Sequence, residues 1–184
     1  MIELHNVRMA YGDKTVFDGL SLAFPERGMF AILGPSGRGK TTLLRLIAGL
    51  ETPQSGSISM PKDARIAFCF QEDRLLPFKT VLDNVMLVCH DEQRARSWIE
   101  KVGLAGEENA YPASLSGGMK RRASLARALA FDAPILLMDE PFRALDDATH
   151  AEMLSLVKEA AKDRLLLLVT HDEADACGMQ VVRL

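Results

Sequence analysis

The sequence of 184 residues has little that would point to a secreted or membrane-spanning protein. It contains only three cysteines, Cys69, Cys89 and Cys177, which are odd in number and too far apart for a metal-binding pattern. Isolated cysteines are typical of a reducing compartment, where each serves as a small apolar residue. No apolar run reaches the length of about 18 residues that a membrane-spanning helix needs. The N-terminus lacks the apolar segment of a signal peptide, so we expect membrane contact only through docking onto another protein.

An excess of positive charge is also missing. The 22 lysines and arginines are outnumbered by 25 aspartates and glutamates, which gives a net charge of −3. Proteins that bind nucleic acid through its phosphates carry a clear positive excess. The one basic run, Lys120, Arg121 and Arg122 followed by Arg127, is interpreted as a solvated helix face. We therefore expect no nucleic-acid partner.

What the sequence does contain is the pattern of an α/β protein. Short, continuous apolar runs at 29–33, 135–138 and 165–169 predict strands that are buried on both faces. They alternate with segments of helical periodicity at 40–50 and 148–161, and the first strands, up to residue 24, have an edge-type alternation. The pattern predicts a three-layer α/β core with a mostly parallel central sheet. A helical insertion, at about 72–130, interrupts this core.

A glycine-rich loop, "GPSGRGKTT" at 34–42, lies between a predicted buried strand and a predicted helix. It fits the phosphate-binding pattern G-x-x-x-x-G-K-[ST] in the context that this pattern requires. Glycines let several N–H groups point at phosphate oxygens, and the helix start adds its positive dipole end. Lys40 would reach the β- and γ-phosphates, and Thr41 would ligate Mg²⁺. The candidate nucleotide-binding residues here are Gly34, Pro35, Ser36, Gly37, Arg38, Gly39, Lys40, Thr41 and Thr42.

Polar residues follow the strands predicted at 135–138 and 165–169 and a further strand candidate, "ARIAFCF", that ends at Phe70. These residues lie at the sheet edge where ligands bind in open α/β folds. Asp139 is placed to hold Mg²⁺, and Glu140 to orient or deprotonate an attacking water. His171 would hydrogen-bond the γ-phosphate, and the amide oxygen of Gln71 would ligate Mg²⁺ or hold water. The plainer alternatives are acids at a strand exit, a capping histidine and a solvated loop glutamine. The complete phosphate loop beside them favours the catalytic interpretation for the acids.

A second glycine turn, in "LSGGMKRR" at 115–122, is redundant within one molecule that already has a phosphate loop. Ser116, Gly117 and Gly118 precede a predicted helix and would form another anion site. Two copies with two-fold symmetry would each cap the ATP bound in the other's phosphate loop. The alternative is an ordinary helix start with Ser116 as N-cap.

Taken together, these motifs resemble the nucleotide-binding subunit of an ATP-binding cassette (ABC) transporter, over essentially the whole chain. In chain order, the matching motifs are Walker A at 34–42, the Q-loop at Gln71, the signature at 115–119, Walker B at 135–140, the D-loop at 144–146 and the switch histidine His171. The resemblance implies a single ABC domain at 1–184, with a P-loop NTPase core, an N-terminal antiparallel β subdomain and the inserted helical subdomain. It implies ATP and Mg²⁺ as ligands and Glu140 as the catalytic base, with Lys40 and His171 as further catalytic residues. Tyr11, by pattern only an exposed tyrosine, would stack on adenine, and Ser116, Gly117, Gly118 and Met119 would face the partner's nucleotide.

The sequence departs from the family pattern at two positions. Met119 stands where glutamine is common, and Arg143 stands where a small residue is usual. The first change removes a polar side-chain contact, and the second lies near the expected dimer interface. We also expect that the chain has no room for the C-terminal regulatory domain of some relatives.

The resemblance also implies partners. It implies multi-span membrane permease subunits, a second ATPase subunit expected to be an identical copy, and an extracytoplasmic solute-binding protein. The chain would be peripheral, at the cytoplasmic face of the inner membrane. Leu75, Leu76, Pro77 and Phe78, directly after Gln71, are either core or a docking groove for a membrane partner, and the resemblance favours docking. The nearest branch is that of importers for nitrate, sulfonate or taurine-type anions.

Two other functions remain as alternatives. A soluble ABC-type ATPase that acts on ribosomes or DNA usually has two cassettes or a long coiled-coil insertion, and neither is present. A small-molecule kinase with a phosphate loop is disfavoured by the signature segment ahead of "ILLMDE".

Overall fold

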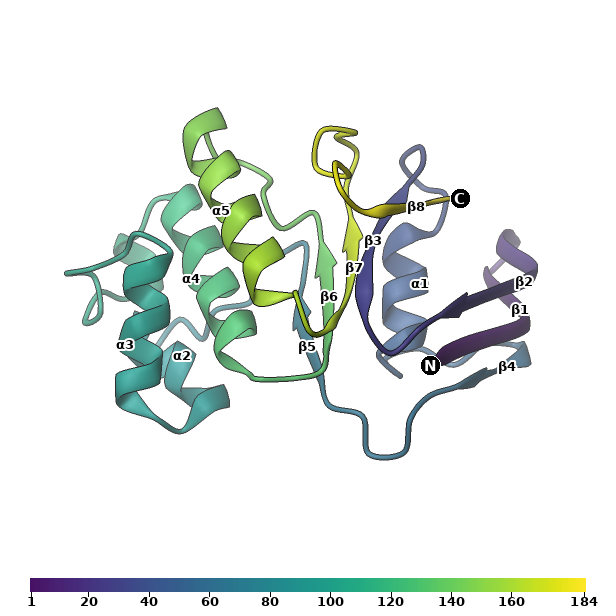
Figure 1. Cartoon of the computed structure of the whole chain (residues 1–184), viewed down its shortest axis with the longest axis horizontal. Helices are drawn as coiled ribbons and strands as arrows, with labels where there is room; N and C mark the ends of the chain where they lie inside the picture. Colours follow the sequence, from purple (N-terminus) through teal and green to yellow (C-terminus); the bar gives the residue numbers. More distant parts are fainter.

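The computed structural model describes all 184 residues as two β-sheets and five α-helices (Figure 1). The larger sheet has five strands in the order β5-β6-β7-β3-β8, and every pairing in it is parallel. Its strands are β3 (Gly28–Leu33), β5 (Ile66–Cys69), β6 (Ile135–Asp139), β7 (Leu165–Val169) and β8 (Gln180–Arg183). The predicted parallel sheet is confirmed.

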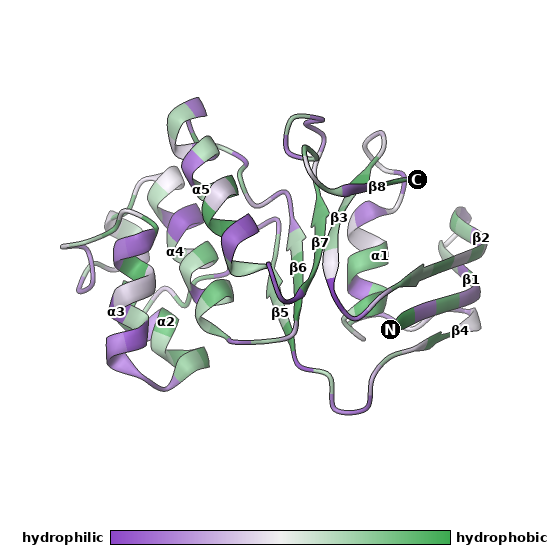
Figure 2. Cartoon of the chain, in the orientation of Figure 1, coloured by the Kyte–Doolittle hydropathy of each residue, from purple (hydrophilic) through white to green (hydrophobic).

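Strands β6 and β7 are buried along their whole length, and Figure 2 shows them as hydrophobic. Successive side chains of a strand point to opposite faces. Leu136 and Leu166 accordingly join one core cluster with the helices on one side, whereas Leu137 and Leu167 join a second cluster on the other side. These two clusters are the interfaces of the predicted three-layer core.

The smaller sheet is antiparallel, with the order β2-β1-β4. Its strands are β1 (Ile2–Tyr11), β2 (Lys14–Phe24) and β4 (Ser55–Ser59). The inward side chains of β1 and β2 pack against α1 (Lys40–Ile47) in the second cluster. The sequence did not indicate β4, because "SGSIS" has a single large apolar residue and the strand depends on pairing with β1.

The remaining helices are α2 (Val81–Cys89), α3 (Glu92–Lys101), α4 (Gly117–Ala130) and α5 (Asp147–Ala160), all on the other side of the large sheet from α1 (Figure 1). The first part of the predicted helical insertion contains two short helices, α2 and α3, and the left-handed residue His90 ends the first of them. The first helix of the chain was predicted too long: α1 ends at Ile47, Gly49 turns left-handed with φ 67°, and Leu50 is exposed. None of the helices is long and apolar enough to cross a membrane.

Candidate active site

The glycine-rich loop connects β3 to α1, as predicted. Gly39 is the N-cap of α1 and has a left-handed backbone with φ 94°. A Cβ atom at Gly39 would lie 2.4 Å from Cγ1 of Val16 and 2.8 Å from Cζ of Phe17, both on β2. No other residue fits there, because the left-handed region is unfavourable for side chains and the loop packs directly on β2.

Lys40 begins α1 and its side chain turns back into the loop. The ammonium donates to the carbonyl oxygens of Gly34, at 2.6 Å, and Pro35, at 3.1 Å. These bonds hold the Lys40 charge against the glycine-rich loop, directly before α1. A cation combined with a helix N-terminus makes a strong site for phosphate.

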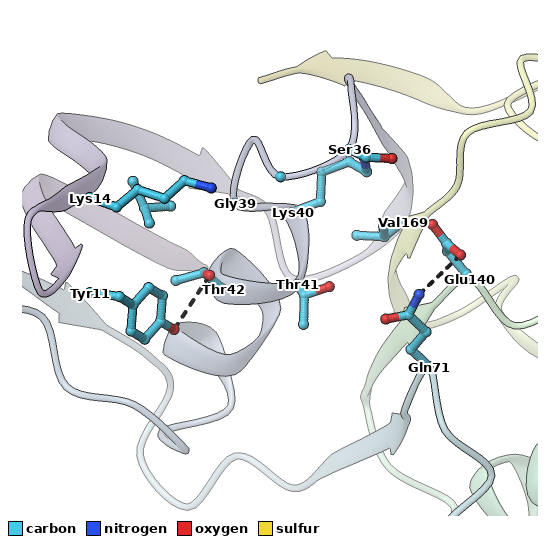
Figure 3. Close-up of a pocket in the computed structure, with 12 residues that line it drawn as sticks. Tyr11, Lys14, Ser36, Gly39, Lys40, Thr41, Thr42, Gln71, Glu140 and Val169 are labelled. Carbon is cyan, nitrogen blue, oxygen red and sulfur yellow. Dashed lines mark hydrogen bonds between the residues drawn. The ribbon is translucent and has the colours of Figure 1, made fainter.

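A cleft of about 290 Å³ lies beside this loop (Figure 3). It brings together residues from β1, β2, the loop and α1 with residues at the C-terminal ends of strands in the large sheet. Of the predicted residues, Tyr11, Ser36, Gly37, Gly39, Lys40, Thr41, Thr42, Gln71 and Glu140 line it. Sequence reasoning missed Lys14, Val16 and Val169, whose side chains carry no motif and enter the cleft only through the packing of β2 and β7.

The two acids at the end of β6 differ in environment. Asp139 is only 2% exposed, and this burial raises the pKa of its carboxyl group, against the opposing hydrogen bond of Thr41. Glu140 reaches the cleft, where its Oε2 accepts a hydrogen bond of 3.3 Å from the Gln71 amide. His171 Nδ1 lies 3.8 Å from Oε1 of Glu140. The predicted meeting of Gln71, Glu140 and His171 at one edge of the sheet is therefore observed.

The backbone of Glu140 is left-handed, with φ 46°. Its N–H donates to the carbonyl of Val169, at 2.9 Å. A non-glycine residue rarely adopts this conformation, and surrounding contacts must maintain it. The turn after β6 therefore directs the Glu140 carboxylate toward Gln71.

Tyr11 lies at the mouth of the cleft. Its hydroxyl donates to a carboxylate oxygen of Glu51 and is 3.5 Å from Oγ1 of Thr42 (Figure 3). Partial burial and the Glu51 contact raise the pKa of the Tyr11 phenol. Glu51 in turn lies 3.5 Å from Arg45. These contacts hold an exposed aromatic ring beside the phosphate loop.

The second glycine turn does not line the cleft of its own chain. Ser116 is the N-cap of α4, with its Oγ accepting from the N–H of Met119 at 3.2 Å, so the plainer interpretation of Ser116 holds locally. A Cβ at Gly117 would meet nothing within 4 Å, and one at Gly118 would make only ordinary contacts. Neither glycine has a left-handed backbone. The fold of this chain therefore gives no reason for glycine at either position.

The basic run on α4 is not the solvated helix face that the sequence suggested. Arg121 is 3% exposed, and Arg121, Arg122 and Arg127 all donate to backbone carbonyls of other segments. The spacing held a signal for this, because Arg121 lies four residues before the buried Leu125, on the same helix face. The prediction of a solvated face was wrong because it considered the charge of these residues and not their position on the helix.

The two positions that depart from the family pattern have different surroundings. Met119 is half-buried and packs against the larger core cluster. Arg143 is exposed, and its N–H donates to the Glu140 carbonyl at 3.3 Å.

A phosphate loop at a strand-to-helix junction, with a buried aspartate and an adjacent glutamate at the end of a neighbouring parallel strand, defines a P-loop ATPase. The sequence model of the family described as "ABC transporter" matches residues 17–143. The aliphatic sulfonates import ATP-binding protein SsuB 2 of Streptomyces avermitilis is 43% identical over 180 residues, which are 95% of this chain and 72% of that protein. The protein SsuB of Granulibacter bethesdensis, with the same description, is 45% identical over 181 residues, or 96% of this chain and 75% of that protein.

Solved structures agree with these sequence relatives. The dimeric post-hydrolysis state of the ATP-binding cassette MJ0796 bound to ADP and Pi matches with a TM-score of 0.93 at 30% identity, over 100% of this chain and 94% of that chain. The chain belongs to the ABC transporter family. It is an ATP-binding cassette that hydrolyses ATP as a subunit of such a transporter, which favours transport over an action on ribosomes or DNA.

Proposed function

We propose that this cassette drives the import of an organic anion of the sulfonate class. It would work as a symmetric dimer beneath membrane-embedded permease subunits, at the cytoplasmic face of the inner membrane. An extracytoplasmic protein would deliver the solute. The names of the relatives, which cover most of this chain at 43% and 45% identity, support the direction and the solute class. The mechanism is supported by the geometry of the cleft.

In the proposed mechanism, the amides of the loop and the Lys40 ammonium bind the β- and γ-phosphates of ATP. Tyr11 stacks on the adenine from the mouth of the cleft. The Glu140 carboxylate accepts a proton from a water that attacks the γ-phosphorus, and the bond to the β–γ bridging oxygen breaks as ADP leaves. His171, close to Glu140, hydrogen-bonds the transferred phosphate. Gln71 orients the Glu140 carboxylate through the 3.3 Å hydrogen bond.

Mg²⁺ fits the oxygen donors in this cleft together with the buried Asp139 carboxyl group, which hydrogen-bonds Thr41 at the cleft wall. The Asp139 carboxylate, the Thr41 hydroxyl and the Gln71 amide oxygen would hold it, directly or through water. No group of three or more His, Cys, Asp or Glu side chains forms a metal site anywhere in the chain. These oxygen donors suit Mg²⁺, which keeps waters and phosphate oxygens as ligands and needs few protein carboxylates. When bound, the ion would neutralise charge on the phosphates.

The main support for the proposed dimer comes from the surroundings of Gly117 and Gly118. Both face open or loosely filled space in their own chain, yet they stand at the N-terminus of a 14-residue helix. We infer that the bare backbone binds the γ-phosphate of ATP held by the second copy, with Ser116 contributing its single backbone N–H and its hydroxyl. Each ATP would then be enclosed by the loop of one copy and the signature turn of the other.

The segment after Gln71 is the proposed contact with the membrane partner, within an inserted helical subdomain at about 72–130. Leu75 packs against the larger core cluster, so part of the segment is core. Phe78, in contrast, is 72% exposed and lies three residues before the first residue of α2. A large apolar side chain this exposed is suited to bind a short helix of another protein.

The test of this function is the variant Glu140→Gln. It retains the shape of the side chain but removes the proton acceptor, so ATP binding persists while hydrolysis nearly stops. The expected result is a stable dimer in the presence of ATP, seen by size-exclusion chromatography with light scattering, where the wild type returns to monomer. The double variant Glu140→Gln/Gly117→Asp should stay monomeric while still binding ATP. A Glu140→Gln protein that hydrolyses ATP at the wild-type rate would contradict the mechanism.

A further inference from the structure

The guanidinium of Arg121 donates hydrogen bonds to five backbone carbonyl groups, none of which belongs to its own helix. Its Nε donates to the carbonyl of Pro141 at 2.8 Å. One terminal nitrogen, Nη2, donates to Asp139 at 3.0 Å and to Glu140 at 2.5 Å. The other, Nη1, donates to Phe70 at 2.7 Å and Gln71 at 3.2 Å. All three nitrogens are thus directed at the carbonyl groups of two segments that meet in the active site.

These two segments carry the groups that touch the reacting atoms in the proposed function. One bears the Glu140 carboxylate, and the other bears the Gln71 amide that contacts it. The planar guanidinium has its donors in a fixed arrangement, so it sets the separation of the segments as well as binding them. Arg121 is buried, which strengthens these charge-assisted hydrogen bonds.

The same contacts explain the unusual backbone of Glu140. Its left-handed conformation, with φ 46°, is disfavoured for a glutamate and needs support from its surroundings. Arg121 binds the carbonyl on each side of the turn, at Asp139 and Pro141, as well as that of Glu140 itself. Without these donors the turn would relax and the carboxylate would move away from Gln71.

We propose that Arg121 is a positioning residue for ATP hydrolysis: it fixes the left-handed turn of Glu140 and ties that turn to the Gln71 segment and to the helix that begins at the signature glycines. The inference rests on the proposed role of Glu140 as proton acceptor. Arg121 lies four residues after Gly117, or about 6 Å along α4. Contact of the signature turn with the partner's nucleotide would therefore be transmitted to the catalytic turn of the same chain through this side chain.

The test is the variant Arg121→Lys, which keeps the positive charge but loses the planar arrangement of several N–H donors. The variant Arg122→Lys is the matched control. Arg122 is the next residue on α4 and also donates to two carbonyls, those of Val102 and Gly103, away from the active site. For Arg121→Lys we expect kcat to fall on the order of tenfold to a hundredfold, because displaced catalytic groups lose rate steeply. The affinity for a fluorescent ATP analogue should stay close to wild type, whereas the thermal midpoint should fall somewhat, because buried hydrogen bonds are lost. The control should keep kcat within about twofold.

A second measurement separates positioning from general loosening. In the Glu140→Gln background, Arg121→Lys should cause no further loss of the residual single-turnover rate, because the group that it positions is already gone. The inference is overturned if kcat is retained, if ATP affinity falls in proportion to kcat, or if the two losses add. The proposed function fails in a different way, through a wild type whose hydrolysis does not depend on Glu140.

Discussion

At the scale of single residues, glycine positions divide into those that the fold needs and those that it does not. Gly39 needs to be glycine, because of its left-handed backbone and its contact with β2. Gly117 does not, because its backbone is helical and its surroundings are open. Glycine in a helix is less stable than alanine. The fold of this chain therefore does not explain glycine at position 117, which is consistent with the proposed contact with a second copy.

This contrast predicts opposite effects for two alanine variants. Gly117→Ala should leave the free energy of unfolding unchanged or raise it by up to about 1 kcal/mol, since alanine favours the helix. Its ATP turnover should nevertheless fall, because the methyl group would separate the signature turn from the partner's phosphate. Gly39→Ala should lose both stability and ATP binding. Urea denaturation and a phosphate-release assay measure both quantities, and wild-type turnover in Gly117→Ala would argue against a nucleotide shared between copies.

Sequence reasoning found most of the residues that line the cleft, because phosphate binding imposes a fixed spacing of glycines, lysine and hydroxyl. Glu140 and Gln71 were predicted from their places at strand ends, and their contact follows from the parallel sheet. Arg121 and Lys14 were missed for one reason: their roles depend on which distant backbone or loop they meet. The local sequence does not specify such contacts, although the spacing of Arg121 before the buried Leu125 indicated that the arginine itself is buried.

At the scale of elements, the buried strands were the surest predictions, since helices on both faces require continuous apolar runs. The start of α1 at Lys40 was predicted, but its end and the existence of β4 were not. Helical periodicity continues to residue 50, but Gly49 ends the helix by turning left-handed. Strand β4 lacks apolar alternation, and its place is decided by hydrogen bonds to β1.

The start of α2 provides a test of local energetics. Thr80 and Asp83 form a capping box in which each side chain accepts from the other's N–H, at 3.1 and 3.2 Å. The backbone and side-chain hydrogen bonds of Thr80 lower the pKa of Asp83. The carboxylate therefore stabilises the folded state fully above its pKa in the unfolded chain, and this contribution is lost as the pH falls through the lower pKa of the folded state.

Asp83→Ala should consequently be less stable than wild type at neutral pH, and the difference should shrink in acid. Urea denaturation at about pH 7 and about pH 3 measures it, with the window set by the lowered pKa of a carboxyl group. Glu152→Ala, an exposed site on α5 without a capping contact, is the control. A difference between Asp83→Ala and wild type that grows in acid would show that the cap is not the source of the shift.

At the scale of the whole molecule, the large sheet separates two hydrophobic core clusters, one on each of its faces. The cluster with α1 and the smaller sheet supports the phosphate loop, and the cluster with α2 to α5 supports the signature turn. The cleft lies at the sheet edge between them, and the signature turn lies outside it. Relative displacement of the two clusters would therefore change the distance between the loop and the signature turn, which suits a molecule that closes on nucleotide through a second copy.

The last prediction concerns the partner of this molecule at the membrane. Phe78→Glu places a charge on the exposed apolar side chain that follows the Gln71 segment, so binding to permease subunits should be lost while ATPase activity of the isolated chain persists. Val181→Glu is the matched control, since Val181 is an apolar residue that is 46% exposed on β8, an edge strand of the large sheet. The measurement is a tagged pull-down from detergent-solubilised native membranes with mass spectrometry of the bound proteins. A multi-span membrane protein retained by the wild type and by Val181→Glu, and lost by Phe78→Glu, is the expected result. Recovery of ribosomes, nucleic acid or only soluble proteins would instead indicate that the ATPase acts on a partner other than a membrane transporter.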